Sequence, residues 1–331
     1  MAFEAIRTER LVIRAPQPGD VDAAFARRSL PEVARYQDWE MPYSRERAQR
    51  SVERSIEVAA QWPNDHRTWN PTVVDAEHPE LILGDLAVEL RWDGRVGYFG
   101  YTFHPDSWGR GYATEASLAL LNHLFDDVGI VRIESSLDPV NIASARVLEA
   151  CGLLFEGHTI QSFWVGEERS DDMLYGATRA EWERWRDRPR HRAARVRLVP
   201  LTAENADAVS AIRAHKSQER FAPPPGGIFR EALLDETLEL CAIEADGQIV
   251  GAVLAVTVQH PRLHTIVIDR LHQRRGIGSA ALEIIEREAR AHGADEVTLA
   301  WAEGAGSPAG FFQQRGYRRA GDNGPGVKRL G

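Results

Sequence analysis

Hydrophobic residues recur along the chain with two alternating spacings, and this alternation predicts strands interleaved with helices. The stretch 96–105 ("VGYFGYTFHP") is rich in aromatic residues and predicts a strand. The stretch 113–127 ("ATEASLALLNHLFDD") predicts an amphipathic helix, because large apolar residues return every three or four positions (Leu118, Leu121 and Phe125).

The same pattern continues beyond this helix. Residues 130–137 ("IVRIESSL") are rich in β-branched side chains and predict a second strand, which an Asp-Pro pair then ends. Asn141 is suited to begin a helix that runs through Ala150, because its side chain can accept a hydrogen bond from the first turn. Gly152 can take the left-handed conformation that often follows a helix end.

The C-terminal half repeats this order of elements. Its predicted strands are "HTIVID" and "EVTLAWA", and its predicted helices are "SAALEIIEREARAH" and "AGFFQQRGY". Each half also opens with a strand, a turn and a helix ("TERLVIRAPQPGDVDAAF" and "RVRLVPLTAENADAV"). The interval from Gly111 to Gly152 equals that from Gly276 to Gly316 to within one residue, which indicates duplication of one domain.

An arginine-rich stretch separates the two halves. Residues 184–197 ("RWRDRPRHRAARVR") are polar, broken by Pro189, and flanked by apolar-rich regions. A solvated linker is the favoured interpretation, and a nucleic-acid-binding patch is the alternative. We therefore expect one domain in residues 1–188 and a second in residues 195–331.

Composition narrows the function. The 331 residues are 43% hydrophobic and 27% charged, as expected for a globular protein, and the net charge of −9 favours cationic partners over nucleic acid. Cys151 and Cys241 form no CxxC pair, so the sequence suggests neither a disulfide framework nor a metal site. We recognise no leader peptide and no apolar run long enough for a membrane, so we expect a cytoplasmic protein.

Two glycine-containing turns carry the candidate chemistry. "SWGRGYATEA" (107–116) and "HQRRGIGSAAL" (272–282) each join a predicted strand to a predicted helix. Free N–H groups at a helix N-terminus favour an anion, and glycine lets a diphosphate approach the main chain. Arg110, Arg274 and Arg275 add charged donors, so both turns are candidate diphosphate sites.

Two other nucleotide folds fit less well. "GIGSAA" satisfies the GxGxxA dinucleotide pattern, but Glu296, which has the expected spacing for a ribose contact, begins its strand instead of ending it. A P-loop lacks its Gly-Lys-Ser/Thr sequence.

Both turns resemble the acetyl-CoA loop of the GNAT superfamily of N-acetyltransferases. In the second half the match is at Gln273, Gly276 and Gly278. In the first half, "HPDSWGRGYATEA" and "DPVNIASARVLEACGL" are similar to the RimJ/RimL branch, with matches at Gly111, Ala113, Asn141 and Ser144. The resemblance implies an α/β fold with two tandem GNAT-like domains, each a mixed, mostly antiparallel, splayed sheet flanked by helices.

The resemblance also implies which residues contact acetyl-CoA. For the first half these are the end of the strand and the loop, with the helix that follows the next strand (Phe103, Arg110, Gly111, Tyr112, Ala113, Thr114 and Asn141). For the second half they are the residues of the loop (Gln273, Arg274, Arg275, Gly276, Ile277, Gly278 and Ser279).

The implied reaction is direct attack of an amine on the thioester, which needs an acid for the thiolate and a base for the amine. Ser144 is the expected acid. Glu89 is the expected base, with Glu134 and His104 as alternatives. In "ARYQDWEMPYS" (34–44), Trp39 with Asp38 and Glu40 is expected to contact a cationic substrate.

The second half departs from the family pattern. "FFQQRG" places Phe312 where many relatives have a tyrosine acid, and "AGSPAG" replaces the expected asparagine. The sequence therefore predicts an acetyl-CoA-dependent N-acetyltransferase of a small-molecule or peptide amine. The alternative is a non-catalytic acyl-CoA-binding or partner-binding module, at least for the second half. We expect no metal, nucleic-acid or membrane partner, and the sequence is compatible with a homodimer.

Overall fold

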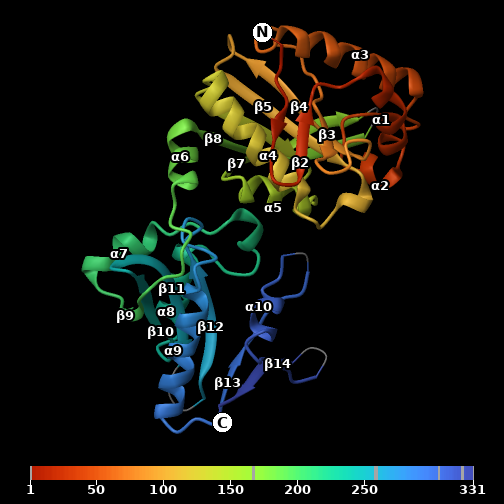
Figure 1. The fold of residues 1–331 in the computed structure, drawn as a ribbon. Helices are drawn as coiled ribbons and strands as arrows, with labels where there is room; N and C mark the ends of the chain where they lie inside the picture. The colour runs from red at the N-terminus through yellow and green to blue at the C-terminus, as the bar shows by residue number, and fades with distance from the viewer. Residues whose placement is uncertain (1, 166–167, 257–259, 305, 322–323, 331) are drawn as a thin grey trace. The chain divides into compact units, whose positions relative to one another are not determined.

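The fold is described from a computed structural model that covers residues 2–165, 168–256, 260–304, 306–321 and 324–330. The chain forms two compact units, Met1–Arg186 and Asp187–Gly331 (Figure 1). Each unit is a mixed sheet flanked by helices, which confirms the predicted fold class. No helix in the described ranges is long and apolar enough to cross a bilayer.

The sheet of the first unit has eight strands in the order β1-β2-β3-β4-β5-β6-β8-β7. All neighbouring strands are antiparallel except β5 and β6, which are parallel. The strands are β1 (Ile6–Arg7), β2 (Leu11–Arg14), β3 (Thr72–Asp75), β4 (Ile82–Arg91), β5 (Val96–Phe103), β6 (Arg132–Leu137), β7 (Leu154–Val165) and β8 (Glu168–Thr178).

Helices cover both faces of this sheet (Figure 1). They are α1 (Val21–Arg28), α2 (Pro31–Ala34), α3 (Arg45–Gln61), α4 (Tyr112–Asn122), α5 (Ile142–Ala150) and α6 (Arg179–Arg186). Asp85 of β4 points toward α1, whose Arg27 and Arg28 bind its carboxylate. The next residue, Leu86, is fully buried in the apolar cluster that includes residues of α4 and α5. We call these faces the α1 face and the α4 face.

The helix predicted for 113–127 has a different second half. α4 ends at Asn122, and His123–Val128 forms a single π-helical turn with Gly129 N–H donating to Leu124 O at 3.0 Å. The wider turn buries the adjacent residues Leu124 and Phe125 completely, which a regular amphipathic pattern does not predict. Phe125 stacks on Trp182 of α6 at 4.5 Å between ring centroids.

The second unit repeats the arrangement with seven strands in the order β14-β15-β13-β12-β11-β10-β9, of which β12 and β13 are parallel. The strands are β9 (Val196–Pro200), β10 (Glu239–Ala245), β11 (Gln248–Val256), β12 (Arg262–Ile268), β13 (Glu296–Leu299), β14 (Arg318–Arg319) and β15 (Gly326–Arg329). The α-helices are α7 (Ala203–Ser210), α8 (Pro225–Leu234), α9 (Ile277–Ala291) and α10 (Ala309–Gln313).

The arginine-rich stretch is not a free linker along its whole length. Ala193 N–H donates to Arg275 O at 3.0 Å, and Arg275 Nε donates to His191 O at 3.1 Å. The N–H groups of Ala194 and Arg195 both donate to the Asp246 carboxylate. The expected solvated linker is therefore wrong for residues 191–195, which bind the second unit by main-chain hydrogen bonds.

Candidate functional site

A gap opens between β5 and β6 in the first unit. The two parallel strands pair only at their first residues, from Val96 with Arg132 to Tyr98 with Glu134. β5 continues to Phe103 and β6 to Leu137 without pairing to each other. Main-chain groups of the unpaired segments can therefore receive an extended ligand in the manner of an added strand.

On the α4 face, this gap is spanned by one pair of side chains. The Tyr101 hydroxyl lies 2.8 Å from Ser144 Oγ and donates to the Ser144 carbonyl at 2.9 Å. Ser144 is in the first turn of α5, and Tyr101 is on β5 beyond the last pairing with β6. Burial raises the pKa of Tyr101 above its usual range, so the phenol keeps its proton.

Tyr101 was not among the residues singled out from the sequence. Only its position in an aromatic-rich strand was visible there, and strand alternation alone does not show that β5 and β6 separate at this residue. Ser144, in contrast, was predicted, and the structure brings it to the same gap.

The turn after β5 has the geometry expected for an anion site. Gly111 is in the left-handed conformation with φ of 81° and precedes α4. The first hydrogen bond of this helix is from Glu115 N–H to Gly111 O. The N–H groups of Tyr112, Ala113 and Thr114 therefore have no acceptor within the helix, and together they can bind an anion.

Side chains hold this turn in place. Arg10 forms an ion pair with Glu115 at 2.6 Å and donates to Arg110 O at 3.1 Å. Its guanidinium also lies 4.7 Å from the ring of the buried Tyr112. Arg110 is exposed, and its guanidinium lies 5.1 Å from the same ring. Arg10, which the sequence interpretation missed, thus fixes the turn, while Arg110 is turned to solvent.

Two further predicted contacts have internal partners. The Phe103 side chain is buried, and Trp108 Nε1 donates to its carbonyl at 2.9 Å. Asn141 precedes α5, and its side-chain oxygen accepts from Ser144 N–H at 3.1 Å. Asn141 therefore acts as the N-cap that positions Ser144.

The structure disfavours Glu89 as a base. Arg91 Nε donates to its carboxylate at 2.7 Å and Thr68 at 3.0 Å. The hydrogen bond from Arg91 is the main cause of a lowered pKa for Glu89. A carboxylate stabilised in its charged form is a weak proton acceptor. Glu134 is likewise bound by Arg132 at 2.9 Å, and His104 precedes a short 3₁₀ turn as its N-cap.

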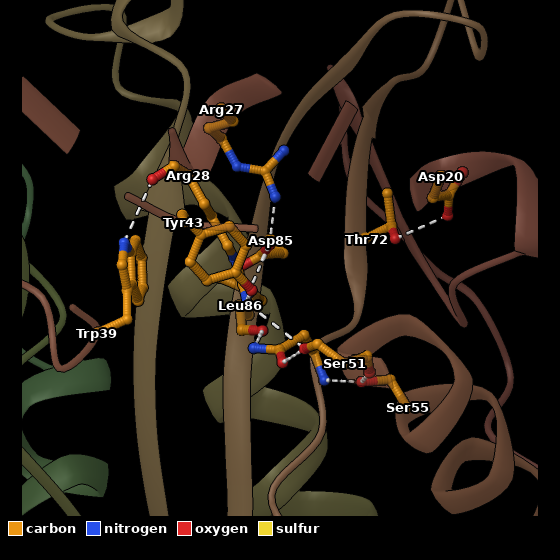
Figure 2. A network of polar contacts seen from close by, with 11 residues as sticks. Asp20, Arg27, Arg28, Trp39, Tyr43, Ser51, Ser55, Thr72, Asp85 and Leu86 are labelled. Carbon is orange, nitrogen blue, oxygen red and sulfur yellow. Dashed lines mark hydrogen bonds and ion pairs between the residues drawn. The ribbon is translucent and has the colours of Figure 1, made fainter. Parts of the chain in front are cut away.

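The predicted substrate segment is attached to the sheet through buried arginines (Figure 2). Trp39 is 7% exposed, and its indole donates to Arg28 O at 3.2 Å. Arg28 binds Tyr43 at 3.2 Å and Asp85 at 3.0 Å, and Arg27 binds the same Asp85 oxygen. Trp39 is therefore a buried anchor and not an exposed aromatic contact. The flanking Asp38 and Glu40 are exposed.

Polar residues continue this network around a small cavity (Figure 2). Thr72 donates to Asp20 at 3.0 Å, and Ser55 accepts from Asn70 N–H at 2.9 Å. The cavity has room for about one water molecule, so an acceptor substrate does not fit into it.

The second unit has a similar gap and turn. β12 pairs with β13 only at Arg262 with Thr298 and at Leu263 with Leu299. Gly276, with φ of 76°, precedes α9, whose first hydrogen bond is from Ala280 N–H to Gly276 O. The N–H groups of Ile277, Gly278 and Ser279 have no acceptor within the helix.

Side chains of this second turn form hydrogen bonds and an ion pair within the second unit. Arg275 is 3% exposed and binds Asp246 at 2.7 Å. Gln273 binds Gln218 and the carbonyl of Ile268, and Ser279 accepts from Arg315. These contacts disfavour the side chains of Gln273, Arg275 and Ser279 as ligand contacts. Arg274 is exposed, so its guanidinium lies at the surface of the turn.

Phe312 is 5% exposed and stacks on Trp301 at 5.9 Å between ring centroids. It supplies no proton at this position of the second unit.

Comparisons with known proteins agree with this architecture. Residues 10–154 match the Acetyltransferase (GNAT) domain, and residues 206–317 match the Acetyltransferase (GNAT) family. The Bacillus subtilis protein named "Uncharacterized N-acetyltransferase YnaD" is 27% identical over 177 residues, covering 54% of this chain and 98% of YnaD. An acetyltransferase (GNAT family) from Bacillus anthracis superposes with a TM-score of 0.47 at 25% identity, covering 53% of this chain and 98% of that one.

A RimL ribosomal L7/L12 alpha-N-protein acetyltransferase, solved in complex with coenzyme A, superposes with a TM-score of 0.47 at 19% identity, covering 53% of this chain and 98% of its own. The two family matches fall in the two structural units. This chain is therefore a tandem member of the GNAT acetyltransferase superfamily, with one GNAT domain in each half.

Proposed function

We propose that the first unit transfers the acetyl group of acetyl-CoA to a primary amine of a small cationic molecule or a peptide. The observation that carries this proposal is the gap between β5 and β6, which has the Gly111 turn near one end and the Tyr101–Ser144 pair across it. The turn supplies main-chain N–H groups for the diphosphate, and the gap accommodates the pantetheine arm. The N-acetyltransferase relatives support the same reaction class.

The Tyr101–Ser144 pair gives the leaving thiolate a proton source. When the C–S bond of the tetrahedral intermediate breaks, the sulfur becomes an anion. The Tyr101 phenol, oriented by its contact with Ser144, can donate to it. In this case Ser144 is a positioning residue. In the alternative, Ser144 donates the proton and Tyr101 replaces it. In either case the pair works as one unit.

A thiol-release assay tests the proposal. The full chain is mixed with acetyl-CoA and a panel of primary amines, and free thiol is followed with a chromogenic reagent while the acetylated amine is identified by mass spectrometry. Release that depends on one class of amine supports the proposal. Tight acetyl-CoA binding without release by any amine contradicts it.

For the second unit we propose acyl-CoA binding without turnover. The buried Phe312 and the internally bonded side chains of its turn favour this role over catalysis. Calorimetry of the full chain with acetyl-CoA distinguishes two binding sites from one, and a stoichiometry of one would contradict binding by the second unit.

A further inference from the structure

The α1 face of the splayed strands carries a second row of polar side chains. The Tyr98 hydroxyl of β5 lies 3.2 Å from Ser136 Oγ of β6. Ser136 is directly opposite Leu174 of β8, and residues two apart on a strand share a face. Asp172 therefore lies on the same face as Ser136, diagonally across the strand pair, and its carboxylate interacts with the Ser136 hydroxyl.

This row reaches the open end of the gap. The pairing of β6 with β8 ends at Leu137 with Met173, one residue before Asp172. Because β5 and β6 diverge toward their C-terminal ends, Asp172 lies where they are separated. Tyr101 and Ser144 meet at that same end on the α4 face. The α4 face thus has a phenol and a hydroxyl at the open end of the gap, and the α1 face has a carboxylate next to it, across β6 from the gap.

Asp172 differs from the other carboxylates of the α1 face. Glu89 is paired with Arg91 and Glu134 with Arg132. Among the described residues, no Arg, Lys or His nitrogen lies within ion-pairing distance of the Asp172 carboxylate. Burial is the main cause of a raised pKa for Asp172, the nearby Asp138 adds to it, and the hydrogen bond from Ser136 opposes it.

The surroundings of Asp172 contain other titratable groups. Asp138, in the turn after β6, is near enough to raise the pKa of Asp172, and the Tyr98 hydroxyl of β5 contacts Ser136. Glu134 lies opposite Gly176, four residues along β8 from Asp172. On the neighbouring strand β7, His158 is bound to Asp171 of β8 at 2.9 Å. Arg91 and Arg132 lie farther along the same face, where both pair with Glu134. Asp138 is the charged group that acts on Asp172, and these two carboxylates favour a cationic ammonium at this position.

We propose that Asp172 is the general base that deprotonates the acceptor amine, with Ser136 and Tyr98 as positioning residues. This assignment rests on the proposed acetyl transfer. Asp172 takes one proton from the ammonium and later releases it to water, and the neutral amine attacks the thioester carbonyl carbon. As the C–N bond forms and the C–S bond breaks, Tyr101 protonates the thiolate and regains a proton from the nitrogen.

The test is the pH dependence of kcat/KM for Asp172→Asn, measured with the amine that the thiol-release assay identifies. A base must be deprotonated, so wild-type kcat/KM falls as the pH drops through the raised pKa of Asp172. We expect Asp172→Asn to lower kcat/KM by about 10²-fold or more and to remove that acidic limb. The acetyl-CoA affinity of Asp172→Asn, measured by calorimetry, should stay within about twofold of the wild-type value, because the loss of one distant charge has only a weak, screened effect on binding.

Asp22→Asn is the matched control, since Asp22 is exposed on α1 and pairs with Arg45 at the surface. It should keep the wild-type rate and profile. An Asp172→Asn variant with the wild-type kcat/KM and pH profile would overturn the assignment of Asp172 as the base, while leaving the proposed acetyl transfer intact. A wild-type chain that binds acetyl-CoA and acetylates no amine would overturn the proposed function, and the assignment with it.

Discussion

Tyr101 and Ser144 meet across a gap in the sheet, with the phenolic oxygen of one 2.8 Å from Oγ of the other. The two residues come from different elements, β5 and α5, and no main-chain pairing joins β5 to β6 at this level. The contact therefore joins β5 to the first turn of α5, beside main-chain segments of β5 and β6 that do not pair and can receive a ligand between them.

Tyr101→Phe removes the hydroxyl and keeps the ring that packs against the core. If the phenol protonates the leaving thiolate, kcat should fall by about 10²-fold while acetyl-CoA affinity changes little. Steady-state kinetics with calorimetry separate the two effects. Tyr36→Phe, a half-buried residue outside the gap, serves as the control. An equal loss in affinity and turnover for Tyr101→Phe would indicate a packing role instead.

Gly111→Ala tests the turn before α4. Its φ of 81° is left-handed, so a Cβ there costs about 1–2 kcal/mol unless the turn changes shape. Such a change would misalign the N–H groups of the first helical turn. We expect acetyl-CoA affinity to fall by about tenfold or more, because a tenfold change corresponds to about 1.4 kcal/mol of binding free energy. Gly129→Ala is the matched control, because Gly129 has φ of 86° and open space around it. An unchanged affinity for Gly111→Ala would exclude this turn as the diphosphate site.

Much of the fold was predictable from periodicity, and the reason is visible in β6 and α5. β6 lies within residues 130–137, whose β-branched side chains predicted a strand, and the Asn141 cap and the left-handed Gly152 match the expected helix boundaries. The spacing between equivalent glycines likewise reflects the helix, strand and helix that both units place between them.

The site was less predictable, because the roles of most of its polar residues depend on partners distant in sequence. Glu89 has a suitable position on the α1 face, but Arg91 and Thr68 stabilise its charge. Arg275 has the right residue type for a phosphate contact, but Asp246 and the carbonyl of His191 bind it inside the second unit. Trp39 is buried where its indole donates to the carbonyl of Arg28, the last residue of α1, whose side chain binds Asp85. Of these pairings, the one between Glu89 and Arg91, two residues apart on β4, is the one that local spacing could have indicated.

Asp85→Asn should destabilise the first unit strongly. The Asp85 carboxylate binds both Arg27 and Arg28, which are 3% and 7% exposed, so its loss leaves two buried guanidinium groups without their counter-ion. We expect a loss of about 3 kcal/mol or more in the free energy of unfolding, measured by urea titration. Asp22→Asn, which breaks the exposed ion pair with Arg45, should cost less than about 1 kcal/mol. Equal effects of the two variants would show that the buried pair adds little.

Asp20 links the stability of the first unit to pH. Burial opposes its charge, but hydrogen bonds from Arg14 and from Gln17 N–H outweigh this effect, so the pKa of Asp20 is lowered. A group with a lowered folded pKa stabilises the fold above its unfolded pKa of about 4. That stabilisation is lost as the pH falls from there through the folded pKa, because the carboxylate must then be protonated.

Urea midpoints for the first unit should therefore fall more steeply below pH of about 4 in the wild type than in Asp20→Asn, which has no proton to take up. Asp20→Asn should also be the less stable chain at neutral pH, where the ion pair with Arg14 at 2.7 Å is fully formed in the wild type. Parallel acid profiles for the two chains would contradict this origin of the pH dependence.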